Sequence, residues 1–319
     1  MIDKILLDRI HRIKFGNLTL DEKIHISKNY ILPEISKKFG LEGMINIDDS
    51  VFKFIIEEYT NEPGIRKYKE IMFEIIGEIN LDILNKNIAD ELQLPIKITI
   101  EDIRNKYFKD KNEINHKKIH SSSEVGVINA LWANSIGQGG VLPLQVKFFP
   151  SNCFLELKLT GSLGDVMKES VKVSLTTAWN MTSPDVQNEL IKKYNDVKNN
   201  QVCGIHIHCP DCATPKDGPS ATTAFTIIIY SIFNNIKIKN YIGITGETSF
   251  DYCLTEIGGL EQKIVGGIKA GITEFIYPSE NEKDFKKFLD KYKDKDDVIG
   301  IKFNAVNNIY EAIDIILDK

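Results

Sequence analysis

One short stretch, Thr214 to Ala221, constrains the fold of this chain more than any other. It reads TPKDGPSA and joins a strand-like apolar run, Val202 to His208, to a long apolar run that is typical of a helix, Ala221 to Phe233. Pro is well tolerated at the first helical position, because its missing N–H would have no partner there. Ser220 is therefore predicted to lie at a helix N-terminus, where free N–H groups and the helix dipole favour negative charge.

A serine in this place is a candidate nucleophile, since its attack on a carbonyl creates an oxyanion that a helix end can stabilise. The candidate base is Lys263, the last residue of IGGLEQK, and Gly258-Gly259 predicts a break before a helix that ends near Gly271. The dipole at that helix start and burial would both favour the neutral amine, which could take the serine proton. Considered alone, a serine at a helix start is more often a cap, and a helical lysine is more often solvated.

Five motifs change this balance, because their order and spacing resemble the proteolytic domain of Lon proteases. They are GSLGDVMKES from Gly161, IHIHC and PKDGPSA within residues 205–221, TGE from Thr245, and IGGLxxK ending at Lys263. The resemblance implies an α+β fold in which a small helical subdomain precedes a compact α/β Lon-type proteolytic domain. It also implies a Ser–Lys dyad of Ser220 and Lys263, with Thr245 orienting the lysine.

The first part of the chain is predicted to be mainly helical. A capping-box pattern, Thr19-Leu20-Asp21-Glu22, opens the first helix, and a short strand is expected within residues 94–100. The segments LLDRI, LTLDEK, NYILPE, DDSVFKFIIEEYT and EPGIRKYKE resemble, in order, the small α-subdomain of the AAA+ module that precedes the protease in Lon. Arg66 matches the arginine that reaches bound nucleotide in that family (sensor 2); the alternative is a surface arginine at a helix start.

The remaining parts of a nucleotide site are not found in the sequence. It contains no G-x-x-x-x-G-K-[ST] motif and no apolar strand ending in paired acids. We therefore expect no cofactor for this polypeptide, with ATP and Mg²⁺ acting only in a longer Lon-like enzyme. The chain is expected to be a fragment of such an enzyme, a natural truncation being the other possibility. The expected domains are a truncated lid subdomain (1–108), a polar linker (109–122) and a serine protease domain (123–319).

The run from His206 to Cys212 offers potential metal ligands in the pattern H-x-H-C-x-x-C. Structural zinc sites usually draw their ligands from two separated pairs, and the matching run in the Lon family leads to the serine, so no metal site is predicted. His206 and His208 are expected to be structural or to shape the active-site wall. A Ser–His arrangement is the competing interpretation; it is disfavoured because both histidines belong to the strand leading to the loop.

The residues just before Ser220 are candidates for stabilising the oxyanion. Pro219 has no N–H, so the donors are expected from Ser220 itself and from Gly218 or Asp217. The Asp217 carboxylate could instead fold over the serine as a gate, or stabilise the loop as a cap.

Four residues depart from the Lon pattern around this site. Tyr252 and Thr222 replace glycines, Glu256 replaces a proline, and Glu261 replaces a lysine. None removes the dyad, but together they leave the geometry of the turns and the shape of the substrate groove open.

The composition limits the partners and the cellular compartment that can be expected for this chain. The net charge of −5 gives no basic footprint for nucleic acid, no apolar run approaches the ~20 residues of a membrane span, and five scattered cysteines suit a reducing compartment. The expected location is cytoplasmic, or the mitochondrial matrix if a targeting segment lies upstream. The expected function is that of a serine endopeptidase acting on unfolded or damaged proteins within a homohexameric ring. An ATP-independent peptidase and a catalytically idle assembly module are the alternatives.

Overall fold

The computed structural model describes residues 6, 9–11, 13, 16–60, 62–85, 94–114, 118–134, 137–196, 201–212 and 214–318. The chain divides into two compact units, residues 1–115 and 116–319, and each has its own hydrophobic core. The division falls inside the segment expected to be a linker. On its first side the Ile114 N–H donates to the Glu58 carbonyl (2.7 Å), and on its second side the Ile119 N–H donates to the Ala270 carbonyl (3.2 Å).

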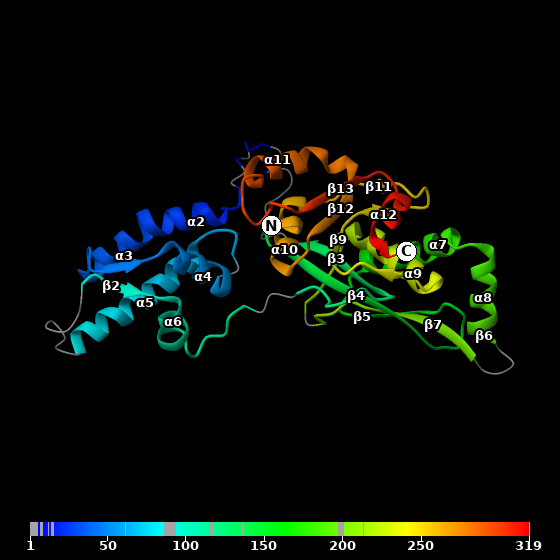
Figure 1. Ribbon diagram of the computed structural model, residues 1–319, viewed down its shortest axis with the longest axis horizontal. Helices are drawn as coiled ribbons and strands as arrows, with labels where there is room; N and C mark the ends of the chain where they lie inside the picture. The colour runs from blue at the N-terminus through cyan, green and yellow to red at the C-terminus, as the bar shows by residue number, and fades with distance from the viewer. Residues whose placement is uncertain are drawn as a thin grey trace. The chain divides into compact units, whose positions relative to one another are not determined.

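The first unit is built mainly of helices (Figure 1). The predicted capping box forms, since the hydroxyl of Thr19 accepts from the Glu22 N–H and the Glu22 carboxylate accepts from the Thr19 N–H. The helices are α2 (Leu20–Ile26), η1 (Ser27–Ile31), α3 (Leu32–Phe39), α4 (Asp49–Tyr59), α5 (Arg66–Asn85), α6 (Ile100–Asp102) and η3 (Ile103–Tyr107). The predicted strand is present as β2 (Ile96–Ile98), and it pairs in parallel with β1 (Ile45–Ile47), which was not predicted because three residues are too few to show alternation.

The second unit is organised around a mixed sheet, which confirms the predicted α+β class. In its described part eight strands form this sheet, in the order β13-β12-β9-β3-β4-β7-β5, with β6 paired to β7. Strands β4 and β7 are antiparallel to their neighbours β3 and β4, and the pairs β3–β9, β9–β12, β12–β13 and β5–β7 are parallel. The strands are β3 (Val127–Ala133), β4 (Gly139–Pro150), β5 (Leu157–Thr160), β6 (Asn195–Asp196), β7 (Gln201–His208), β9 (Ile242–Ile244), β12 (Glu274–Pro278) and β13 (Lys302–Val306).

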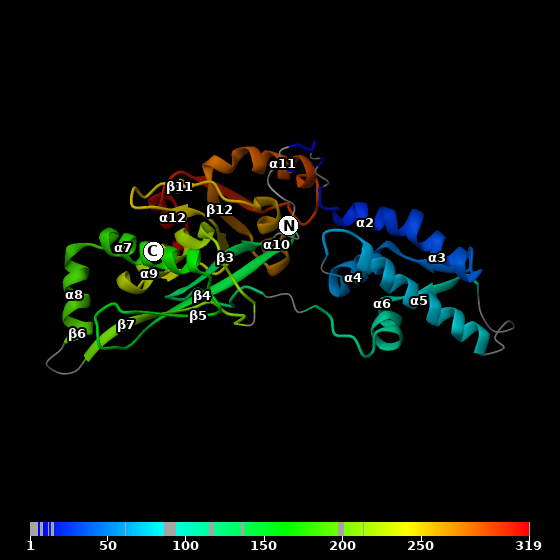
Figure 2. The same cartoon turned by 180° about the vertical axis from the view of Figure 1, so that it is seen from behind.

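Helices pack on both faces of the sheet (Figures 1 and 2). One core lies under α7 (Asp165–Met181), α8 (Pro184–Tyr194), α9 (Thr222–Asn234) and α12 (Ile309–Ile316), and another under α10 (Leu260–Ala270) and α11 (Glu282–Tyr292). Strand β12 shows the alternation directly, because Ile276 belongs to the first core while Phe275 and Tyr277 belong to the second. Two short antiparallel pairs lie outside this sheet: β8 (Lys237–Ile238) with β14 (Leu317–Asp318), and β10 (Glu247–Thr248) with β11 (Leu254–Thr255).

Strand β13 begins at Lys302, after residues 294–300, which form turns, and α8 ends at Tyr194. Residues 197–200 lie outside the described part of the chain. Among the described helices, none combines the length and the apolar character that crossing a bilayer requires.

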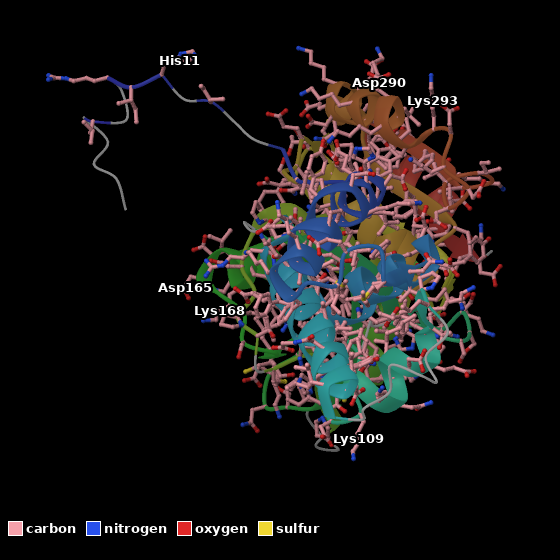
Figure 3. All side chains as sticks on the ribbon, turned by 90° about the vertical axis from the view of Figure 1, so that its left-hand side faces the viewer. His11, Lys109, Asp165, Lys168, Asp290 and Lys293 are labelled. Carbon is pink, nitrogen blue, oxygen red and sulfur yellow. The ribbon has the colours of Figure 1, made fainter. Side chains whose placement is uncertain are left out.

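Charged side chains line the exposed ends of two helices of the second unit. Asp165 and Lys168 project from the start of α7, and Asp290 and Lys293 project from the end of α11 (Figure 3). Asp165 and Lys168 form an exposed ion pair at 3.1 Å, a kind of contact that contributes roughly 0–1 kcal/mol to stability. These four side chains therefore belong to the solvated surface.

Candidate active site

Ser220 lies in a single 3-10 turn, η4 (Pro219–Ala221), that leads directly into α9. Gly218 precedes the turn with φ +133°, a conformation that residues with a Cβ rarely adopt, so the sequence Gly-Pro-Ser sets the shape of the turn. The hydroxyl of Thr222 donates to the Pro219 carbonyl at 2.5 Å and so closes the turn from the helix side. The glycine that Thr222 replaces in the Lon pattern could not make this bond.

The loop before the turn is held by Lys216. Its ammonium group donates to the carbonyls of Gly161 (3.1 Å), Asp211 (2.5 Å) and Thr214 (2.9 Å). Gly161 must be a glycine, because a Cβ there would lie 1.9 Å from the Cys209 carbonyl oxygen. The sequence contained Lys216 within its motif but gave no sign of this role, since a lysine that binds backbone carbonyls leaves no pattern.

Asp217 caps the neighbouring helix α7. Its Oδ1 accepts from the Met167 N–H at 2.9 Å and from the Gly218 N–H at 3.0 Å. The side chain lies so close to Gly164, at the start of α7, that a Cβ there would be 2.3 Å from the carboxyl carbon. This geometry corresponds to a stabilising cap rather than to a carboxylate that folds over Ser220 as a gate. The Gly218 N–H, which was expected to face an oxyanion, donates to Asp217 instead.

Lys263 lies in the first turn of α10, as the glycine break at Gly258-Gly259 predicts. The side chain is only 2% exposed, and its Nζ donates to Thr245 Oγ1 at 3.0 Å. Burial lowers the pKa of this amine from 10.5 to about 8, because a charged ammonium loses its hydration there. At neutral pH an appreciable fraction of Lys263 is therefore unprotonated and able to accept a proton.

A close backbone contact holds α10 against the sheet. A Cβ on Gly139, at the start of β4, would lie 2.0 Å from the Gln262 carbonyl oxygen, and a Cβ on Gly266 would lie 2.1 Å from the Gly139 carbonyl. Only glycine allows two backbones to approach in this way. The backbone of Lys263 takes part in the same close approach, since its N would lie 2.9 Å from a Cβ on Gly139.

Thr245 connects the lysine to the serine. It is fully buried directly after β9, and its N–H donates to the Ile276 carbonyl at 3.1 Å. Its hydroxyl accepts from Lys263 and donates to the Ser220 carbonyl at 3.2 Å, which also accepts from the Gly246 N–H at 2.9 Å. In the described structure no hydrogen bond joins the Ser220 hydroxyl directly to the Lys263 amine. The fold nevertheless brings the three residues that the sequence singled out into one hydrogen-bonded group.

His206 and His208 lie on β7, and their side chains form hydrogen bonds with Thr160 rather than with Ser220. Thr160 on β5 shares its hydroxyl with His206 Nε2 (3.0 Å) and His208 Nδ1 (2.8 Å). Burial, with smaller contributions from the charges of Lys158 and His208, lowers the pKa of His206. These hydrogen bonds support the structural interpretation rather than a Ser–His arrangement.

The run that follows β7 does not gather its potential metal ligands. Cys209 is buried in the main core, and burial raises the pKa of its thiol to about 12. Across the described residues, no cluster of three His, Cys, Asp or Glu side chains has an arrangement suited to a metal ion.

Arg66 begins α5 in the first unit. Its side chain is 93% exposed and lies 3.3 Å from the Glu70 carboxylate. This is compatible with the surface arginine weighed above, and its role toward nucleotide stays a prediction.

Tyr252, which stands where the Lon pattern has a glycine, lies in the connection between β10 and β11 and adopts the backbone conformation that a glycine would favour. Tyr252 adopts φ +66°, and its carbonyl accepts from the Ile309 N–H at 2.9 Å. The tyrosine ring packs against Tyr310, with 5.5 Å between the ring centroids. The ring contact, worth about 1 kcal/mol, offsets part of the roughly 1–2 kcal/mol cost of a left-handed residue.

Comparisons with known proteins all find similarity to Lon proteases. The model of the Lon protease (S16) C-terminal proteolytic domain matches residues 97–319. A Lon protease homolog of Acanthamoeba polyphaga mimivirus is 31% identical over 98% of this chain and 35% of its own length. The Lon proteases of Campylobacter jejuni and Fervidobacterium nodosum are 34% and 32% identical over 93% and 100% of the chain. The chain spans about a third of the length of these relatives, 35% to 37%.

Proposed function

This chain belongs to the family of the Lon protease C-terminal proteolytic domain, and from that premise we propose that it hydrolyses peptide bonds with a Ser–Lys dyad of Ser220 and Lys263. The observation that carries the proposal is the buried Lys263 amine, bonded to Thr245 Oγ1 at 3.0 Å and linked through it to the Ser220 turn.

In the first half of the reaction Lys263 acts as a general base. The neutral amine takes the proton of the Ser220 hydroxyl while Oγ attacks the carbonyl carbon of the peptide bond. Thr245 supports this step, because by accepting one N–H of Lys263 it orients the amine within its buried site. The resulting oxyanion forms near the start of α9, where the helix dipole and the N–H of Ser220 favour negative charge.

In the second half the protonated Lys263 returns its proton. It protonates the leaving amine, so that the C–N bond breaks and an acyl ester remains on Ser220 Oγ. Water then attacks the ester carbon and gives a proton to Lys263, which passes it back to Ser220 as the carboxylic acid leaves. The enzyme is regenerated, and one water is consumed for each peptide bond cleaved.

The properties of a longer enzyme are proposed on the resemblance alone. There the substrates are unfolded or damaged proteins, the chain assembles as a homohexameric ring in the cytoplasm, and ATP with Mg²⁺ acts through parts that this sequence does not contain. Arg66 would contact the nucleotide in that setting. For the chain as it is, slow hydrolysis of unfolded peptides without ATP is the expected activity.

A fluorogenic unfolded peptide tests the dyad. Ser220→Ala and Lys263→Ala are each expected to lower turnover by at least about a hundredfold, the usual scale for loss of a nucleophile or its base. Lys269→Ala is the matched control, because Lys269 lies on the same helix α10 with an exposed side chain. Equal turnover in the wild type and in all three variants would leave the assembly module as the better interpretation.

A further inference from the structure

We propose that Asn281 is a positioning residue, which fixes the glycine hinge from which α10 carries Lys263. This inference deepens the proposed function and rests on it, since Lys263 matters for hydrolysis only as the base. Asn281 itself lies away from the reacting atoms and acts through the backbone of Ile257.

The contact between Asn281 and Ile257 has two parts. Asn281 ends the short turn η5 (Ser279–Asn281) that follows β12, and its side chain is 2% exposed. Its Oδ1 accepts from the Ile257 N–H at 3.0 Å, and its Nδ2 donates to the Ile257 carbonyl at 2.8 Å. One amide side chain thus satisfies both backbone groups of a single buried residue, which fixes the orientation of Ile257 as well as its position.

The segment that follows Ile257 explains why this contact matters. Only Gly258 and Gly259 separate Ile257 from α10, and Gly259 has φ +73°. Glycine permits many backbone conformations, so the two residues would act as a hinge if nothing held their start. The Lys263 N–H donates to the Gly259 carbonyl at 3.0 Å, which places Lys263 one helical turn beyond the hinge.

A second contact from the same turn supports the first but is weaker. Glu280 accepts from the Glu256 N–H at 2.8 Å in an exposed position, where water can replace it. A proline, usual at position 256 in the Lon pattern, could not donate this bond. Because Ile257 is buried, loss of Asn281 instead leaves an N–H and a carbonyl without partners, which is the costlier case.

The test compares Asn281→Ala and Asn281→Asp with Asn304→Ala. Asp keeps an acceptor for the Ile257 N–H but cannot donate to its carbonyl. Asn304 on β13 is the matched control, since its amide bonds the Phe275 carbonyl and the Glu274 carboxylate and does not touch Ile257. Each variant is first checked for folding by circular dichroism. Peptide kinetics and an NMR titration of isotope-labelled Lys263 are then recorded.

For Asn281→Ala we expect kcat to fall about tenfold with KM within about twofold, because misplacement of a catalytic group affects the chemical step. Asn281→Asp should fall between this variant and the wild type. In both, Lys263 should titrate above its wild-type pKa of about 8, since a loosened hinge admits water to the amine. Asn304→Ala should leave the titration unchanged even if it lowers stability.

Wild-type kcat and wild-type Lys263 titration in a folded Asn281 variant would overturn the positioning role. If Asn281→Ala does not fold, Asn281→Asp decides in the same way. Failure of the proposed function would look different: the wild type would show no Ser220-dependent hydrolysis, while the titration of Lys263 still moved in the Asn281 variants.

Discussion

The side chain of Lys263 is held where its charged form is unfavourable. Its pKa is lowered from 10.5 to about 8 by burial, which corresponds to about 3 kcal/mol of cost to the folded state whenever the amine is protonated in both states. Below pH 8 the full cost is present. Between pH 8 and 10.5 the unfolded chain binds more protons at this lysine than the folded chain, so stability rises with pH across that window.

Replacing Lys263 with methionine should therefore stabilise the protein while abolishing hydrolysis. At pH 7 the free energy of unfolding of Lys263→Met should exceed that of the wild type by up to about 3 kcal/mol, and the difference should shrink toward zero near pH 10.5. Urea unfolding at pH 7, 9 and 10.5 measures this difference, with Lys269→Met as the exposed control. A difference that does not change with pH would show that the amine is not desolvated as described.

Ser220, Thr245 and Lys263 could be predicted from the sequence, because each stands in a short motif next to glycine or proline residues that fix its local backbone. Lys216 and Asn281 could not be assigned roles. Both bind backbone carbonyls or N–H groups of distant segments, Gly161 and Ile257 among them, and such partners leave no mark on residue spacing. Sequence therefore indicates the residues proposed to react more readily than the residues that hold them in place.

At the scale of elements, the long apolar runs were predicted well and their ends less well. Helices α9 and α10 begin within one residue of the expected positions, because a proline and a glycine pair mark their starts. Strand β1 escaped prediction, since it depends on pairing with β2 far along the chain. Strand β13 likewise depends on a partner, since all five of its residues pair with β12.

Asp217 joins two elements, and its replacement distinguishes the cap from the gate. If it caps α7, Asp217→Ala should lower the free energy of unfolding by about 1 kcal/mol, the usual loss for a removed helix cap, and Asp217→Asn should lose less. Thermal unfolding measures the loss. A gate would instead predict unchanged stability together with a higher rate of peptide hydrolysis in Asp217→Ala.

The whole chain contains two units with separate cores, and this determines where the chain can be cut to express the second unit alone. Residues 97–319 match the proteolytic-domain model, yet β2 (Ile96–Ile98) pairs with β1 inside the first unit, so a fragment cut at residue 97 carries a strand without its partner. The structural division lies later, between residues 115 and 116.

Residues 116–319 expressed alone should therefore unfold cooperatively, because they contain two complete hydrophobic clusters and the whole Ser220–Thr245–Lys263 group. Calorimetry checks the unfolding, and the fluorogenic peptide checks whether Ser220-dependent hydrolysis survives at a rate within about threefold of the full chain. A fragment that binds hydrophobic dye and melts without a transition would mean that the first unit is needed for the second to fold.

The meeting of Gly139 and Gly266 also limits how a protein of this kind can diverge. Each position lacks the room for even a methyl group, since the opposing carbonyl would lie about 2 Å away. Substitution of either glycine by a larger residue is therefore possible only if the facing backbone moves away at the same time. Such a movement of α10 relative to β4 would also displace the amine of Lys263. A natural variant with a larger residue at either glycine should thus be suspected of having lost its base, even where the serine and the lysine are both retained.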